Sequence, residues 1–258
     1  MVPVERAGSR SWADLVAASD DRDLEGWCRD RWLVRRPLAR LPDSFGATLD
    51  SLHAVAEHLL SPCRFAATGK IGLRFTYHGF GSPFFGPDRQ VRVEDGVLVD
   101  GDDRHELSTI RAAGAFLGIE PGAPADVYQP ATALDLDVPL TVHAASARAL
   151  GDWFGFGASL LEQLRADASE EDATGRVQIW PEHFDIAVDV GRDGARANFG
   201  ASPGDNAHPE PYLYVGPWEL RAGEFWNEPF GASLSYSAIL AGADPLEFLR
   251  RGRDLLAQ

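Results

Sequence analysis

The stretch RQVRVEDGVLVDGDDRHELS, residues 89–108, decides the fold class. Apolar and polar residues alternate on both sides of the pair Asp95-Gly96. A period of two is typical of a half-buried strand, and Asp-Gly between two alternating runs indicates a hairpin. A second turn is expected at residues 100–103. The stretch therefore predicts antiparallel strands joined by tight turns.

Further strands and helices are expected on both sides of this stretch. The alternation in KIGLRFTYHGF predicts a strand over residues 70–80, and the remaining strands are expected near residues 177–190, 195–201, 212–215 and 231–236. Helical spacing and caps predict helices over residues 44–60, 109–118 and 144–168, and a last helix that begins at Asp244-Pro245. The third of these passes several glycines, which lower its helix propensity.

Short turns between strands, with helices set between groups of strands, indicate an α+β fold. We expect a mostly antiparallel sheet or sheets, with helices packed on one side and a strand-then-helix order in both halves. Residues 1–43 are interpreted as a helical or irregular extension, and residues 44–258 as a single domain. Residues 119–140, rich in Pro, Ala and Asp, are expected to be a surface excursion, with a domain boundary as the alternative.

The composition limits the classes of partner and the compartment. The chain has 258 residues and a formal net charge of −15, which disfavours binding to the phosphates of nucleic acids. Cys28 and Cys63 lack the spacing of a zinc site or a disulfide framework. Because neither a signal peptide nor an apolar run of membrane-spanning length is found, we expect a cytoplasmic protein without a membrane partner.

The stretch WPEHFDIAVDVGRDGARANFGASPGDNAHPEPYLYVGPW, residues 180–218, carries the candidate site. If its strands are neighbours, two imidazoles and two carboxylates converge, a donor set that suits zinc, manganese or ferrous iron. The four predicted metal ligands are His183, Asp185, His208 and Glu210. Asp205 and Glu182 are the candidate catalytic residues, as general bases.

A structural interpretation of the same residues stays open. Asp205 and Asn206 are typical of an ordinary turn, and His183 and Asp185 are suited to hydrogen bonds across strands.

Three other groups of residues received both a functional and a structural interpretation. His78, in YHGFGSPFFG, is a candidate third imidazole or general base, but this stretch is also suited to pack Phe80, Phe84 and Phe85 into the core. His53, Glu57 and His58 invite a metal interpretation, because positions i and i+4 share a helix face, but they are expected to be solvated residues beside the leucine stripe of their helix. The Trp-rich segment VGPWELRAGEFWNEPFG, residues 215–231, is either an aromatic wall for a sugar or a cation, or core and rim packing.

The chain resembles an uncharacterised bacterial domain-of-unknown-function family. The resemblance is carried by LHAVAEHL (residues 52–59), GFGSP (79–83), WPEHFDIAV (180–188) and the closing LSYSAILAGADPLEFL (234–249). The family's Trp and Gln on the first helix are absent, and Val55 and Glu57 lie nearby instead. PEH also replaces the family's WGS before the Phe-Asp pair. The resemblance implies a shared fold and carries no activity.

The sequence therefore predicts a small-molecule enzyme with a His and carboxylate site, assisted by a divalent metal in one version. The competing prediction is a non-catalytic module that binds a ligand or another protein, in which the same residues are structural.

Overall fold

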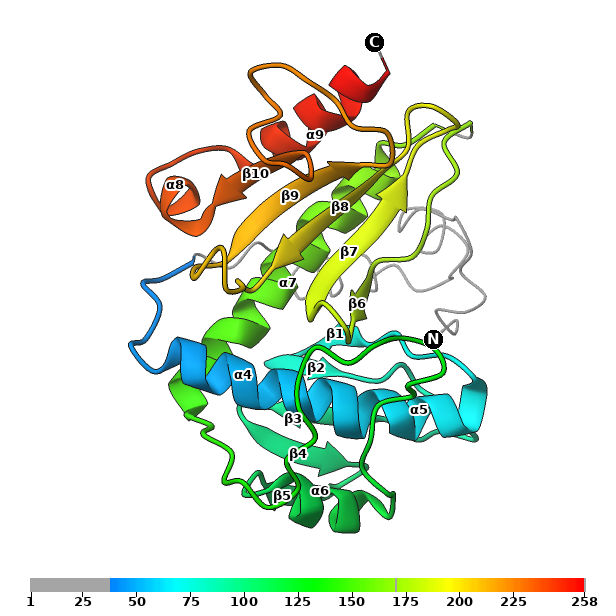
Figure 1. Ribbon diagram of the computed structural model, residues 1–258, viewed down its shortest axis with the longest axis vertical. Helices are drawn as coiled ribbons and strands as arrows, with labels where there is room; N and C mark the ends of the chain where they lie inside the picture. The colour runs from blue at the N-terminus through cyan, green and yellow to red at the C-terminus, as the bar shows by residue number, and fades with distance from the viewer. Residues whose placement is uncertain (1–37, 170, 258) are drawn as a thin grey trace, which may run out of the picture.

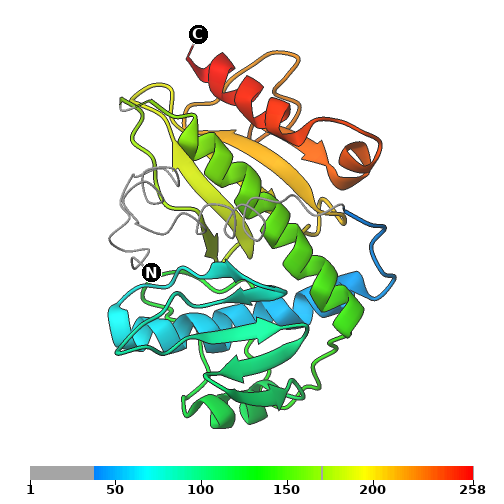
Figure 2. The same ribbon diagram turned by 180° about the vertical axis from the view of Figure 1, so that it is seen from behind.

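The computed structural model describes residues 38–169 and 171–257, so most of the predicted extension over residues 1–43 lies outside the described part. The described chain forms helices and two five-stranded antiparallel sheets (Figure 1 and Figure 2). The predicted α+β class with antiparallel sheets is confirmed. Over the same residues, no helix combines the length and the hydropathy that crossing a membrane requires.

The first sheet is a meander in which each strand pairs with the next one along the chain. The β3–β4 hairpin turns at Asp95 and Gly96, whose φ angles are 51° and 85°. A type I′ turn needs positive φ at both central residues, which Asp-Gly tolerates, so the predicted hairpin is confirmed. The strands are β1 (Arg74–Thr76), β2 (Gly79–Gly81), β3 (Val91–Glu94), β4 (Val97–Asp100) and β5 (Asp103–Glu106).

The second sheet has the strand order β10-β9-β8-β7-β6. An isolated antiparallel bridge between Leu73 and Ile179 joins it to the first sheet near β1 and β6. Two backbone hydrogen bonds, of 2.7 and 2.8 Å, make this bridge. The strands are β6 (Gln178–Trp180), β7 (Asp185–Val190), β8 (Ala197–Ser202), β9 (Tyr212–Pro217) and β10 (Ala232–Ser235).

The longest helix, α7 (Ala144–Ala166), packs against strands of both sheets. Its glycines are close-packing positions. A Cβ atom on Gly151 would lie 2.7 Å from the backbone nitrogen of Gly79, and one on Gly157 would lie 2.7 Å from the Cβ of Ala201. Side chains at these positions would push the helix away from the strands. Close packing of α7 on the strands therefore requires glycine here despite its low helix propensity.

The second sheet has one face covered by helices, which we call the inner face. Both α7 and α9 (Pro245–Leu256) contact strands of this sheet, and α7 meets it at Ile186 and Ala201. The apolar residues at these and alternate positions form the inner face: Ile186, Val188, Val190, Ala197, Phe199, Ala201, Leu213 and Val215. The opposite side, the outer face, is turned to the viewer in Figure 1, where no described helix crosses in front of β7, β8 and β9.

The first helical region is one rod built from three consecutive elements. They are α4 (Phe45–Val55), the π-helix η2 (Ala56–Leu60) and α5 (Ser61–Thr68). Two shorter helices, α6 (Ile110–Leu117) and α8 (Tyr236–Leu240), complete the described helical structure. A π-helical turn widens the backbone and changes which side chains point inward.

Glu57 and His58 lie in this π-helical turn and are 0% and 2% exposed, so their expected solvation is wrong. The Glu57 carboxylate accepts hydrogen bonds from the backbone nitrogens of Ala131 (2.9 Å) and Thr132 (2.7 Å) and from the Thr132 hydroxyl (2.5 Å). The His58 Nδ1 accepts one from the backbone nitrogen of Ala123, at 3.2 Å. A helical sequence pattern does not show that a long loop will fold over that side of the helix.

These bonds hold the segment 119–140, which contains no helix or strand, against the rod. Backbone groups in a segment without regular structure need partners when they are buried, and two ionisable side chains supply them here.

Candidate functional site

The turn between β6 and β7 positions the predicted residues Glu182, His183 and Asp185. The sequence pattern predicts one strand over residues 177–190, but a turn at residues 181–184 divides it. Phe184 has a φ of 50°, and its nitrogen donates a 2.7 Å hydrogen bond to the oxygen of Trp180.

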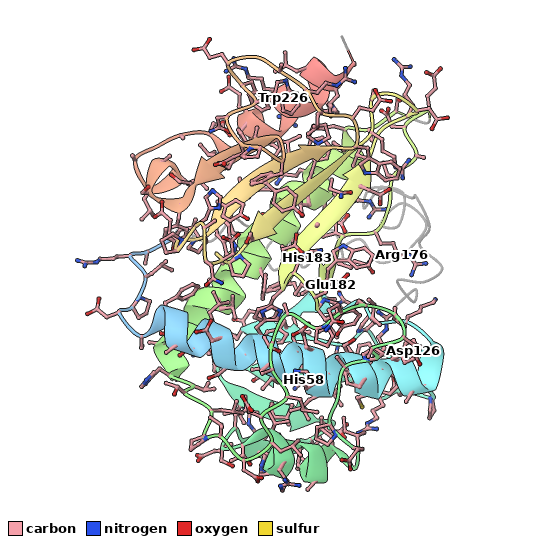
Figure 3. All side chains as sticks on the ribbon, in the orientation of Figure 1. His58, Asp126, Arg176, Glu182, His183 and Trp226 are labelled. Carbon is pink, nitrogen blue, oxygen red and sulfur yellow. The ribbon has the colours of Figure 1, made fainter. Side chains whose placement is uncertain are left out.

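The Phe184 side chain explains this turn. It is buried, and its ring contacts those of Phe80 and Phe154, with centroids 5.0 and 5.4 Å away. His183 is exposed on the turn and shares no strand face with Asp185, contrary to the alternation drawn from the sequence. Figure 3 places Glu182 and His183 where the second sheet approaches the first helical rod.

Asp185 is a buried carboxylate on the outer face. It is 4% exposed, and its Oδ2 accepts a hydrogen bond from the hydroxyl of Tyr214, which reaches across β8 from β9. The Tyr214 ring crosses over Gly200, where a Cβ would lie 2.4 Å from the ring. The glycine is therefore what allows this tyrosine to reach Asp185.

The electrostatics of Asp185 follow from its burial. Burial raises the pKa of its carboxyl to about 6, and the hydrogen bond from Tyr214 and the nearby His183 only partly oppose that rise. Glu182 contributes a further increase, so the two carboxyls lie within electrostatic reach of each other. Within the described residues, neither Asp185 Oδ1 nor Glu182 Oε2 has a hydrogen-bond partner, although both atoms are buried.

Asp205 is engaged in the turn that precedes β9. Its Oδ1 accepts hydrogen bonds from the nitrogens of Ala207 (2.7 Å) and His208 (2.8 Å), and its Oδ2 accepts one from the Tyr212 hydroxyl (2.8 Å). Burial acts to raise the pKa of Asp205, but these hydrogen bonds outweigh it and hold the pKa below its usual range. The turn interpretation of Asp205 accounts for all of these bonds.

His208 and Glu210, two of the predicted metal ligands, have separate partners. His208 Nε2 lies 3.1 Å from Glu228 Oε1, and Glu210 accepts a 2.8 Å hydrogen bond from Ser237. Across residues 38–169 and 171–257, no three His, Cys, Asp or Glu side chains are grouped so as to hold a metal ion. The structure does not gather His183, Asp185, His208 and Glu210 into a metal centre.

The structure instead assembles an outer-face cluster, the residues Asp185, Asp205, His208, Tyr212, Tyr214 and Glu228. The ring centroids of Tyr212 and Tyr214 are 6.3 Å apart, and those of His208 and Tyr212 are 4.7 Å apart, so the cluster is continuous across β7 to β9. The ring centroids of Phe230 and Tyr214 are 6.4 Å apart. Trp218, which is 64% exposed, donates a hydrogen bond from its ring nitrogen to Asn198. Carboxylates and aromatic rings thus lie together on this face.

Tyr212, Tyr214 and Glu228 are not among the predicted site residues. The alternation of Tyr212 and Tyr214 in PYLYV was a usable signal, because it places both rings on one face of a strand. Glu228 had no such signal, since it reaches His208 from a loop 20 residues further along the chain.

His78 and its glycine-rich stretch lie apart from this cluster. His78 Nδ1 is 3.6 Å from Asp95 in the first sheet. Phe80 and Phe85 are buried as that structural interpretation expects, but Phe84 is 55% exposed.

The comparisons with known proteins place the chain in no family. No protein-family profile, no curated protein and no solved structure matches it.

Proposed function

We propose that this protein is a binding module for an organic cation, a guanidinium or ammonium group, recognised at Asp185 on the outer face. The observation that carries the proposal is that Asp185 is buried and that one of its oxygens has no hydrogen-bond donor among residues 38–169 and 171–257. Buried carboxylates are costly unless they are paired, and a cationic ligand supplies the missing donor.

The surroundings of Asp185 favour a cation over other ligands. Glu182 offers a second buried oxygen without a partner in the described structure, which suits the two-pronged geometry of a guanidinium. Tyr212, Tyr214 and Phe230 provide ring faces, which attract cations through the negative charge above the ring.

The net charge of the chain supports the same proposal. At −15 the protein attracts cations over a distance and repels nucleic acids, so we retain the prediction that nucleic acid is not a partner. A cytoplasmic location and a small-molecule ligand also stay predictions that fit this proposal.

An enzyme is the second candidate, and the pKa of Asp185 is the observation that favours it. A carboxyl that titrates near pH 6 is suited to general acid or base catalysis at neutral pH. Of the two predicted bases, Glu182 has one oxygen without a partner in the described part of the chain, whereas both oxygens of Asp205 already accept hydrogen bonds. The metal-assisted version has no support from the arrangement of its four ligands.

Calorimetric titration with agmatine, and separately with the tripeptide Gly-Arg-Gly, tests the proposal. We expect binding that weakens at least about tenfold in Asp185→Asn, since a charge-assisted pair is worth more than 1.4 kcal/mol. Asp88→Asn is the matched control, because Asp88 is exposed in the turn between β2 and β3 and its loss changes the net charge equally.

The two probes separate the sources of the cation. Agmatine binding indicates a free small molecule, and binding of the tripeptide alone indicates an arginine side chain of another protein. If neither probe binds, or if both variants weaken binding equally, Asp185 does not recognise a cation.

A further inference from the structure

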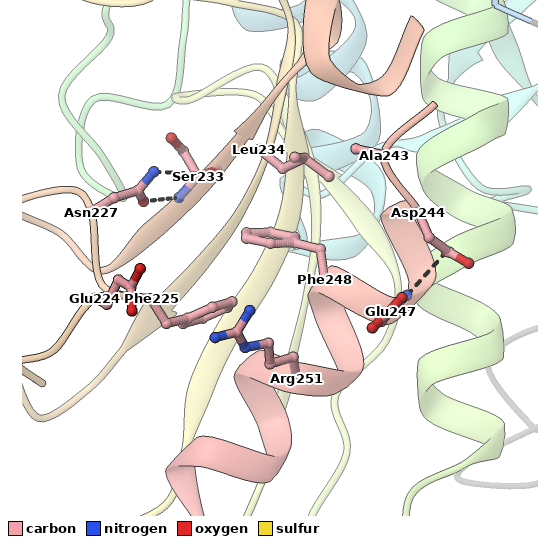
Figure 4. A pocket seen from close by; sticks show the side chains of 10 residues that line it. All are labelled: Glu224, Phe225, Asn227, Ser233, Leu234, Ala243, Asp244, Glu247, Phe248 and Arg251. Carbon is pink, nitrogen blue, oxygen red and sulfur yellow. Dashed lines mark hydrogen bonds between the residues drawn. The ribbon is translucent and has the colours of Figure 1, made fainter. Parts of the chain in front are cut away.

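The free edge of the second sheet lies at β10, and its backbone is occupied by a side chain. β10 pairs with β9 on one side, and no other described strand lies on its opposite side. On the other side, the Ser233 nitrogen donates a 2.8 Å hydrogen bond to Asn227 Oδ1, and the Asn227 amide nitrogen donates a 3.2 Å bond to the Ser233 oxygen (Figure 4). The amide of Asn227 therefore stands where the peptide group of a neighbouring strand would lie.

The residues just before β10 close one end of this edge. Gly231 and Glu228 exchange two backbone hydrogen bonds of 3.0 Å. Exposed strand edges pair readily with other chains, and native proteins cover them. Asn227 covers the edge with a group that a peptide backbone can replace bond for bond.

A hollow of about 370 Å³ lies beside Asn227, between β10, the preceding loop and α9. Its apolar lining includes Phe225 and Phe248, whose ring centroids are 5.3 Å apart, and Leu234 (Figure 4). Side chains of an added strand would alternate between the two faces of the sheet, and those on the side of Leu234 would enter this hollow.

The charges around the hollow favour a basic occupant. Glu224 and Glu247 line it without an ion-pair partner among the described residues, whereas Arg251 lies over the Phe225 ring at 5.4 Å. Asp244 also lines the hollow and accepts hydrogen bonds from the first turn of α9. The three carboxylates outnumber the one guanidinium.

We propose that the β10 edge binds an extended peptide segment of a partner protein by strand addition, with Asn227 as the group that the peptide displaces. The segment carries an apolar side chain for the hollow and basic residues beside Glu224 and Glu247. Backbone hydrogen bonds to Ser233 hold the segment, and the hollow selects its side chain.

The probe is a six-residue peptide, blocked at both ends, with arginine, leucine and arginine at positions 1, 3 and 5 and serine between them, so that these three side chains share the face of the hollow. Its binding to the full chain is measured by calorimetry, and the site is mapped from the amide signal of Ser233 by NMR. Asn227→Ala is expected to bind about tenfold more tightly, because no side chain has to leave the edge. All titrations use chains that also carry Asp185→Asn, because the arginines of the probe would otherwise bind the cation site as well.

A second peptide keeps the test independent of protein folding. The same sequence N-methylated at alternate residues retains every charge but cannot donate the backbone bonds, so its binding is expected to be lost. Equal binding of both peptides, or no binding even to Asn227→Ala, overturns strand addition. Dimerisation of Asn227→Ala in sedimentation velocity also overturns the proposal, because the occupant of the edge would then be a second copy of the chain.

Discussion

Replacing Asp185 by Asn should remove a pH-dependent destabilisation of the fold. The carboxyl has a pKa of about 6 in the folded protein because burial penalises its charge, against an ordinary value of 3.8. The folded state therefore holds a proton at pH values where the unfolded state has released it. This contribution to stability is fully present below pH 3.8 and is lost as the pH rises through about 6.

The magnitude follows from the size of the pKa shift. About two pKa units at 1.36 kcal/mol each give a loss of about 3 kcal/mol over the whole window. Between pH 5 and pH 8, which stays above the isoelectric point of about 4.8, the native chain should lose about 1.4 kcal/mol from this group. Because Asp185 is buried, solvent screening reduces this free-energy difference only slightly.

Urea unfolding followed by tryptophan fluorescence at pH 5, 6, 7 and 8 measures the difference in unfolding free energy between the native chain and Asp185→Asn. The asparagine amide gains no partner, which changes the unfolding free energy of the variant by the same amount at all four pH values. The dependence of the difference on pH is therefore unaffected. Asp88→Asn, an exposed change of the same charge, should run parallel to the native chain. A difference for Asp185→Asn that stays flat from pH 5 to pH 8 would refute the reasoning.

Three further substitutions test the packing around the cluster and the rod. Gly200→Ala should destabilise the fold by about 1–3 kcal/mol in urea unfolding, because its Cβ would lie 2.4 Å from the Tyr214 ring; Gly46→Ala, with no atom within 4 Å, should not. Glu57→Gln should cost about 1.5–3 kcal/mol and speed limited proteolysis of the segment that follows α6, since three hydrogen bonds to a buried carboxylate weaken. Asp244→Ala should cost about 1 kcal/mol, measured in the same urea experiment, because the side chain caps two nitrogens of α9.

The fold class was predictable because its signals are local. The Asp95-Gly96 hairpin follows from two residues that tolerate positive φ, and the cap at Asp244 follows from one side chain at a helix start. The division of the predicted strand at residues 181–184 was not local. Phe184 takes a positive φ because its ring packs between Phe80 and Phe154, which precede it by 104 and 30 residues in the sequence.

The candidate site was predicted in part. The acidic and aromatic residues of the stretch from Trp180 to Trp218 do meet on one face of the sheet, but not as a metal centre. Asp205 and His208 follow the turn chemistry of their own loop, which the sequence offered as an alternative. The importance of Asp185 depends on Tyr214 crossing over Gly200, and no periodicity within one strand predicts a contact that a side chain makes across a neighbouring strand.

The raised pKa of Asp185 and its unpartnered oxygen have one physical origin, and together they argue against a purely structural role. A structural residue at this position needs only an acceptor for the Tyr214 hydroxyl, which an uncharged asparagine also provides. A carboxylate there costs the fold stability at neutral pH, and sites that accept such a cost are commonly functional. Suppose that the stability of Asp185→Asn, measured relative to the native chain, is higher at pH 8 than at pH 5, and that the variant fails to bind agmatine. The Asp185 charge is then responsible both for the loss of stability and for binding. If the variant gains stability between pH 5 and pH 8 but binds agmatine as the native chain does, another group recognises the cation. The other carboxylates of the outer face are then the candidates.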